Sequence, residues 1–202
     1  MKAPRTQAAR RETTRTELLQ LGLERFPEKG FSNTSIDDLL RGSGYSKGAF
    51  YFHFASKEQY FLELMRHRVR GRGEWWRIAE RPELESLHAV LELVYRAFND
   101  GPQTGEGAKW VTIIADFALT ARRSGSASRE LAELEDGWMR ELTAFVEALQ
   151  ARGFARSDRL AGELAQTVQA LMDGSNLLLA VWSRPPSGML DALVRILEPR
   201  EA

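Results

Sequence analysis

The sequence contains no cysteine and no long apolar run. Without cysteine, the chain can form no disulfide framework, no thiolate metal site and no thiol nucleophile. The longest apolar run near the carboxyl end is LLLAVW at residues 177–182, whereas a membrane-spanning helix needs about 20 apolar residues. The first residues, MKAPRTQAARRETTR, lack the apolar segment of a signal peptide. We therefore expect a cytoplasmic protein without a membrane partner.

Several signatures of catalytic sites are also missing. The three histidines, His53, His67 and His88, show neither H-x-x-x-H nor H-E-x-x-H spacing, and no P-loop or G-x-G-x-x-G sequence is present. Acidic pairs such as Glu135–Asp136 are typical of a solvated helix face. These observations indicate a protein that is not an enzyme, and we expect no metal ion and no cofactor.

The formal net charge is zero, but the two ends of the chain differ in sign. Residues 1–72 hold 14 Lys and Arg against 8 Asp and Glu, and residues 73–202 hold 14 against 20. A basic first third suggests contact with nucleic acid, while the acidic remainder is kept away from polyanions. Chance clustering of charge and association with a membrane surface are the alternatives.

The hydrophobic pattern is helical throughout. Alternating strand patterns flanked by turn pairs do not appear, and Val, Ile and Thr are sparse beside Leu, Ala, Glu and Arg. We expect an all-α protein. A first helix over residues 11–26 should end near Pro27 and Gly30. Gly22 inside this helix predicts that another helix packs closely against it.

Two short helices follow, joined by a glycine-containing turn. Thr34 is the expected N-cap of a helix over 35–43 that ends at Gly44, and Ser46 is the expected N-cap of a helix over 46–52. This spacing is that of a helix-turn-helix. Any two short helices joined by a glycine turn share it, so the spacing alone does not establish the motif.

A fourth helix is expected after the segment HFASKEQ, where Ser56 and Gln59 have capping-box spacing. Lys57 in its first turn opposes the helix dipole, which suggests that an anion is shared with the helix amino terminus. The alternative is a solvated surface lysine. This helix should continue to Glu80 and bend near residues 71–73.

The segments LLQLGLERFPEKGFSNTSIDDLL and SGYSKGAFYFHFASKEQYF resemble the DNA-binding domain of TetR-type (tetracycline-repressor-like) transcriptional regulators. The chain departs from the family at Gly22, Leu40 and Gly42, where alanine is usual, and at Tyr45, where valine is usual. The resemblance implies a ligand-responsive regulator, often a repressor, that binds double-stranded DNA as a homodimer at an inverted-repeat operator. A small hydrophobic or cationic molecule would then release it.

Helical spacing places Phe50 and Phe54 in the core of the DNA-binding domain. The resemblance places Tyr51 at a phosphate and Lys47 at a base edge or a phosphate. Phe52 either presses on a thymine methyl group or packs on the first helix. We expect the DNA-binding surface to comprise Thr34, Ser46, Lys47, Gly48, Tyr51, Phe52, His53 and Lys57.

A basic leader precedes the first helix. It is expected to be a disordered arm that settles on DNA, or simply a frayed terminus. We assign residues 1–56 to a DNA-binding domain with this arm and residues 57–202 to a helical effector-binding and dimerisation domain. The basic residues of the leader are Lys2, Arg5, Arg10 and Arg11.

The second domain should hold five further helices, over 85–98, 109–122, 129–152, 158–182 and 189–197, with a break at Pro185–Pro186 before the last. The last two carry apolar stripes that suit an antiparallel pair doubling into an intersubunit four-helix bundle; an intramolecular core is the alternative. The tract ALMDGSNLLLAVW also resembles the dimerisation helix of the family. The expected interface comprises Leu164, Val168, Leu171, Leu178, Leu179, Trp182, Leu193 and Ile196.

This domain is also rich in aromatic and acidic residues. An apolar cavity between helices with a few acids is the usual form of a small-molecule site, although the rings can equally form core. Aromatic walls with a carboxylate favour a flat or cationic compound, and an uncharged hydrophobic compound is the alternative. The expected contacts are Trp75, Trp110, Phe117, Trp138 and Asp173. The competing function is a DNA-binding architectural or adaptor protein without an effector.

Overall fold

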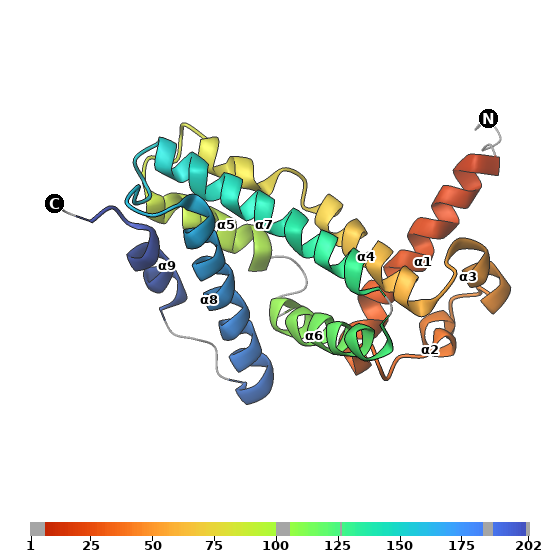
Figure 1. Cartoon of the computed structure of the whole chain (residues 1–202). Helices are drawn as coiled ribbons and strands as arrows, with labels where there is room; N and C mark the ends of the chain where they lie inside the picture. The colour runs from red at the N-terminus through yellow and green to blue at the C-terminus, as the bar shows by residue number, and fades with distance from the viewer. Residues whose placement is uncertain (1–6, 100–105, 126, 184–187, 201–202) are drawn as a thin grey trace. The chain divides into compact units, whose positions relative to one another are not determined.

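The computed structural model describes residues 7–99, 106–125, 127–183 and 188–200, and these residues form helices and no strand (Figure 1). The all-α prediction is confirmed. The chain divides into two compact units, Met1–Gly71 with Ile113–Leu131, and Arg72–Thr112 with Ala132–Ala202. We call the first unit the head and the second the body. The predictions for Lys2, Arg5 and the Pro185–Pro186 break lie outside the described residues.

The head contains four consecutive helices and parts of two later ones. These are α1 (Gln7–Lys29), α2 (Ile36–Leu40), α3 (Lys47–His53), α4 (Lys57–Gly71), the portion of α6 (Glu106–Ser124) that follows Thr112, and the first residues of α7 (Ser128–Ala151), up to Leu131. The expected division after residue 56 had assigned α4 to the second domain. In the structure α4 packs on α1 and so belongs to the head.

The crossing of α1 and α4 explains the glycine inside the first helix. A Cβ atom on Gly22 would lie 2.8 Å from Leu64 Cδ2 and 3.0 Å from Tyr60 Cζ, so only glycine allows this approach. The buried Tyr60 hydroxyl donates a hydrogen bond of 2.7 Å to the carbonyl of Leu18. Close packing at Gly22 was predicted from the sequence and is confirmed.

Helix α1 is longer than predicted at both ends. It begins at Gln7, so Arg10 and Arg11 are helical and do not belong to a disordered arm. It also continues through Pro27 to Lys29. Gly30 then ends it with a φ of +78°, a backbone conformation that favours glycine, and donates its N–H to the Phe26 carbonyl at 2.8 Å.

Helix α4 is shorter than predicted. Ser56 caps its start and accepts a hydrogen bond of 3.1 Å from the N–H of Gln59. The helix ends at Gly71, and Gly73 follows with a φ of +60°. A separate 3-10 helix, η1 (Trp75–Glu80), replaces the expected continuation. The glycines therefore terminate the helix instead of bending it.

Aromatic rings form much of the core of the head. Phe31 and Phe61 lie 5.0 Å apart between ring centroids, and Phe117 of α6 lies 4.8 Å from Phe31 and 4.5 Å from Phe61. The ring of Phe26 meets Phe61 edge to face at 5.3 Å. These buried contacts join α1, α4 and the second part of α6 around one apolar cluster.

The body contains η1, α5 (Leu87–Asn99), the portion of α6 up to Thr112, most of α7 (Ser128–Ala151), α8 (Ala161–Trp182) and α9 (Met189–Leu197). α7 begins in the head, which ends at Leu131. Within the body, α9 packs on both α5 and α8. The core of the body includes Val90, Val146, Leu149, Ala165 and Leu197, all of which are buried.

Candidate nucleic-acid interface and body sites

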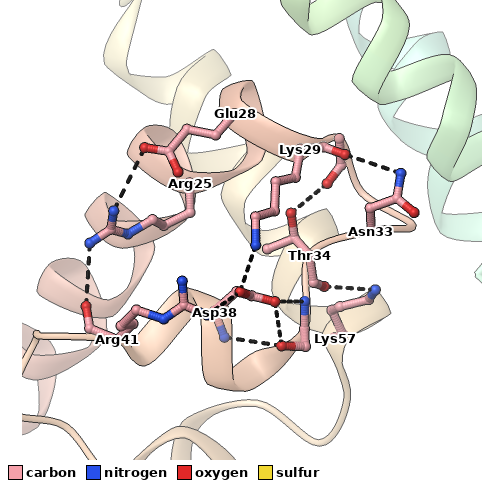
Figure 2. A network of polar contacts seen from close by, with 10 residues as sticks. Arg25, Glu28, Lys29, Asn33, Thr34, Asp38, Arg41 and Lys57 are labelled. Atoms are coloured by element: carbon pink, nitrogen blue, oxygen red, sulfur yellow. Dashed lines mark hydrogen bonds and ion pairs between the residues drawn. The ribbon is translucent and has the colours of Figure 1, made fainter.

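Helix α2 starts one residue later than predicted, because its N-cap is Ser35 and not Thr34. The hydroxyl of Ser35 accepts from the N–H of Asp38 at 3.0 Å, and the carboxylate of Asp38 accepts from the N–H of Ser35 at 3.1 Å. Asp38 also pairs with Lys29 at 2.8 Å and with Arg41 at 2.6 Å, and Figure 2 shows how these side chains converge on it. Hydrogen bonds from Lys29 and then Ser35 hold the pKa of Asp38 well below its usual range.

The turn between α2 and α3 uses two glycines. α2 ends at Leu40, earlier than predicted, and Gly42 and Gly44 have φ angles of +73° and +78°. Other residues rarely adopt this conformation, so the two glycines allow the chain to reverse between the helices. The hydroxyl of Tyr45 donates to the carboxylate of Glu17, which attaches the turn to α1.

Helix α3 has a buried side and an exposed side, as predicted. Its N-cap is Ser46, whose hydroxyl accepts from the N–H of Ala49 at 3.2 Å. Phe50 is only 1% exposed, whereas Tyr51 is 53% and Phe52 is 63% exposed. The fold thus presents two neighbouring aromatic side chains to solvent on α3.

Two of the exposed side chains on α3 have partners within the head. The ammonium of Lys47 lies 2.9 Å from the carboxylate of Asp37. The guanidinium of Arg11 lies 4.8 Å from the centroid of the Phe52 ring. Phe52 therefore contacts α1, one of the two alternatives, and its largely exposed ring leaves contact with a thymine methyl group as a prediction. Burial, and then the charge of Arg11, lower the pKa of His53.

Thr34 and Lys57 are predicted DNA contacts, but in the structure the polar groups of both side chains bond to backbone carbonyls of the head. Thr34 is fully buried, and its hydroxyl donates to the carbonyl of Gly30 at 2.6 Å. The ammonium of Lys57 donates to the carbonyl of Phe31 at 2.9 Å and to that of Thr34 at 3.0 Å. Figure 2 shows the bond to Thr34. Desolvation by burial lowers the pKa of Lys57. Backbone acceptors thus hold the cation that was expected to share an external anion.

A carboxylate from α6, that of Asp116, also holds the loop between α1 and α2. Asp116 accepts a hydrogen bond of 2.7 Å from the N–H of Ser32, and it also accepts from the Ser32 hydroxyl. The loop that leads from α1 to α2 is therefore anchored by Lys57 from α4 and by Asp116 from α6. Sequence patterns gave no indication of either anchor, because both join residues far apart in the chain.

Residues 44–48, GYSKG, have the G-x-S-x-G spacing of a serine hydrolase elbow. Such an elbow places a nucleophilic serine between a strand and a helix. Here Ser46 follows a turn between two helices and uses its hydroxyl to cap α3. This segment is therefore structural.

In the body, two of the predicted ligand residues form a ring stack. Trp75 and Trp138 lie 5.2 Å apart with an interplanar angle of 24°. The indole of Trp138 donates to Gln169 at 2.5 Å, and Gln169 donates to the carboxylate of Asp173 at 2.5 Å. Desolvation raises the pKa of Asp173, and desolvation followed by the charge of Asp173 raises the pKa of Glu135.

The other two predicted ligand rings, Phe117 and Trp110, are not part of the stack of Trp75 and Trp138. Phe117 is fully buried in the head, among Phe31 and Phe61, so it does not belong to the aromatic stack of the body. Trp110 is buried on α6. Helical periodicity cannot distinguish these positions, because each ring lies on an apolar helix face.

An open groove runs between α7 and α8. It has a volume of about 470 Å³ and is lined by Asp136, Met139, Arg140, Thr143, Glu147, Gly162 and Gln166. This volume lies within the range of small-molecule sites, roughly 300–1,000 Å³. Within the described residues, no group of acidic or histidine side chains is arranged to hold a metal ion, and no helix is long and apolar enough to span a membrane.

The predicted dimer residues divide into three sets, which are buried, half-buried and exposed. Leu164, Val168 and Leu193 are buried in the core of the body and so leave little surface for a partner, which corrects the prediction for these three. Leu171, Leu179 and Ile196 are half-buried. The last turns of α8 expose the apolar side chains of Leu177, Leu178, Val181 and Trp182.

Comparison with known proteins agrees with the geometry of the head. The family model for bacterial regulatory proteins, tetR family, matches residues 18–64, which extend from α1 into α4. The HTH-type transcriptional regulator EthR of Mycobacterium tuberculosis is 31% identical over 183 residues, which cover 84% of this chain and 78% of that protein. The HTH-type transcriptional repressor KstR2 of the same species is 41% identical over 84 residues, covering 42% and 40%.

Solved structures share the fold at low sequence identity. The regulatory protein TetR from Rhodobacter sphaeroides matches with a TM-score of 0.70 and 22% identity, covering 91% of this chain and 98% of that one. The reduced form of E. coli NemR matches with a TM-score of 0.66 and 20% identity, covering 91% and 95%. At these identities the likeness concerns the fold alone.

Proposed function

The chain belongs to the tetR family of bacterial regulatory proteins and is therefore a DNA-binding transcriptional regulator, and we propose that it is a ligand-responsive repressor that binds an inverted-repeat operator as a homodimer. Proteins of this family are regulators and not enzymes. The observation that carries the proposal is the exposed side of α3, where Tyr51 and Phe52 lie above the buried Phe50. We place its action in the cytoplasm, where the operator is.

The DNA contacts in this proposal come from α3. Lys47 and Tyr51 are exposed and carry donors that reach phosphates or base edges, while Gly48 lets the backbone approach the groove. Ser46, Phe52 and His53 complete the surface. Few side chains here can read bases directly, so phosphate contacts supply much of the affinity, and binding should weaken steeply with salt.

The test begins with selection of bound DNA from a random pool. Lys47→Ala and Tyr51→Ala should each weaken binding to the selected DNA by roughly tenfold, with the thermal midpoint unchanged. Tyr51→Phe keeps the ring and removes only the hydroxyl, so it separates the contribution of this donor from that of the ring. Normal affinity in both alanine variants would exclude this surface.

We propose that the second copy binds at the carboxyl end of α8. Leu177, Leu178, Val181 and Trp182 form an apolar face there, in the tract that resembles the dimerisation helix of the family. Two copies related by a two-fold axis would read half-sites roughly 34–36 Å apart, or a wider multiple of that spacing.

Sedimentation velocity tests the dimer. Leu178→Arg would place an unpaired charge in the interface and should yield monomers, since such a charge costs several kcal/mol. Leu119→Arg is the matched control, because Leu119 is 59% exposed but lies on α6 in the head. An unchanged dimer in Leu178→Arg would place the interface elsewhere.

The proposed effector site is in the body, where Trp75 and Trp138 stack beside the hydrogen-bonded Asp173. The raised pKa values of Glu135 and Asp173 indicate that neither carboxylate is fully compensated. A lipophilic cation would compensate them, and a neutral aromatic compound is the alternative. The effector would have to bind the released state with about 5.5 kcal/mol better affinity to reverse the equilibrium.

Titration of tryptophan fluorescence with lipophilic cations and neutral aromatics, paired with DNA release, tests this site. Asp173→Asn should weaken cation binding and leave the binding of neutral compounds unaffected.

One observation favours the competing function. Trp75 and Trp138 already pack against each other and against Phe98, with ring centroids 5.2 and 6.1 Å from that of Phe98 respectively. If neither class of compound binds, an architectural or adaptor protein without an effector is the better description.

A further inference from the structure

Two consecutive aspartates on α2 have different surroundings. The side chain of Asp38 is only 17% exposed and is held by Lys29, Arg41 and the Ser35 cap. The side chain of Asp37 is 70% exposed, and its partner is Lys47, itself 56% exposed. The fold therefore uses Asp38 to fix α2, and leaves Asp37 at the surface beside the first residue of the recognition helix.

The Asp37–Lys47 pair contributes little to stability. Water solvates both exposed ions, and holding two mobile side chains together costs conformational entropy. The capping hydrogen bonds of α2 belong to Ser35 and Asp38, so they do not depend on Asp37. The pair instead places a cationic donor, the Lys47 ammonium, 2.9 Å from an anionic acceptor, the Asp37 carboxylate, at the amino end of α3.

That arrangement matches one edge of a base pair. In the major groove, guanine presents two adjacent acceptors, N7 and O6, and the cytosine paired with it presents the N4 amino donor. Residues at the amino end of a recognition helix are the ones that reach base edges. We propose that Lys47 and Asp37 together read one G·C base pair in each half-site, Lys47 donating to guanine and Asp37 accepting from cytosine N4.

An A·T pair fits this arrangement less well. Its single amino donor, adenine N6, lies between two acceptors, adenine N7 and thymine O4, and both repel a carboxylate. The thymine methyl group lies beyond O4. A carboxylate beside an ammonium therefore meets fewer repelling acceptors at a G·C pair than at an A·T pair. This difference makes Asp37 a specificity determinant. The inference depends on the DNA-binding surface proposed above.

The experiment measures base preference and not affinity alone. After selection of the operator with the wild-type protein, each position of one half-site is changed to all four base pairs, and binding is measured by fluorescence anisotropy. Asp37→Ala should reduce the preference for G·C at one position by roughly fivefold to hundredfold. Asp37→Asn should shift that position toward A·T, because an amide matches adenine N6 and N7.

A matched control separates readout from charge. Glu28→Gln removes the same unit of negative charge from another exposed carboxylate of the head, 58% exposed and paired with Arg25. It should raise affinity for all sequences slightly and leave base preferences intact. Thermal unfolding of Asp37→Ala should be unchanged, because the α2 cap remains.

Two results would overturn the inference, and they are distinct. If Asp37→Ala behaves as Glu28→Gln does, with equal changes for every base pair, Asp37 acts only through its charge while the proposed DNA-binding function stands. If the wild-type protein selects no sequence from the pool, the proposed operator binding itself fails, and the inference fails with it.

Discussion

Lys57 provides a direct test of how the head is built. Its ammonium donates to the carbonyls of Phe31 and Thr34 and lies 4.4 Å from the centroid of the Phe31 ring. Hydrogen bonds to a charged group contribute roughly 1.5–3 kcal/mol each, and a cation–π contact at an accessible site about 0.5–1 kcal/mol. Because Lys57 is half-buried, water can replace part of these contacts. We expect Lys57→Met to destabilise the protein by about 2–4 kcal/mol.

Urea unfolding and the salt dependence of DNA binding together decide between two roles of Lys57. A structural lysine should lower the unfolding midpoint and leave the slope of log affinity against log salt unchanged. A lysine that contacts a phosphate should instead reduce that slope by about one, with normal stability. Lys109→Met, which removes an exposed lysine of α6, controls for the loss of one positive charge.

The second of these outcomes would refute the structural reasoning. A Lys57→Met protein with wild-type stability and a shallower salt slope would mean that the hydrogen bonds to Phe31 and Thr34 are not maintained in solution. The lysine would then have the role that the sequence suggested, with its ammonium shared with a DNA phosphate.

Three further predictions concern packing and pH. Gly22→Ala should lower the free energy of unfolding by about 1–3 kcal/mol through overpacking, and the better helix propensity of alanine should offset up to about 1 kcal/mol of this loss. Gly137→Ala is the control in the same urea assay, and it should be neutral or stabilising because its Cβ would meet only an ordinary contact at 3.7 Å. Because the pKa of Asp38 is lowered by folding, its stabilisation is present above the unfolded pKa and lost as pH falls; Asp38→Asn should be less stable at pH 7, and an equal loss at pH 2 would contradict this. Folding raises the pKa values of Glu135 and Asp173, so their effect on stability has the opposite pH dependence: stability is lost as pH rises through the folded pKa. Glu135→Gln should therefore raise the melting temperature at pH 8 more than at pH 4.

Local patterns in the sequence predicted much of the head. Ser46 caps α3 as expected, because an N-cap needs only a short polar side chain before a helix. Phe50 and Phe54 are buried and Tyr51 and Phe52 exposed, because helical periodicity assigns each position to a face. These features depend on residues within a few positions of one another.

The body shows where periodicity stops being sufficient. Leu164, Val168 and Leu178 belong to one apolar stripe, yet the first two are buried in the chain's own core and Leu178 is exposed. A stripe shows that a helix face is covered, but not whether the same chain or a second copy covers it. Trp138 and Phe117 looked equivalent for the same reason, and they lie in different units.

The sequence by itself determined the helical class, the helix α3 and its two sides, because these follow from residue types a few positions apart. Only the tertiary structure decided that Asp38 is the hub of α2 while Asp37 pairs with Lys47, and that Lys57 binds the carbonyls of a loop 23 to 26 residues away. Adjacent aspartates are indistinguishable in a sequence. Their roles differ because segments distant in the chain bring a cation, a cap or open solvent to one carboxylate and not to the other.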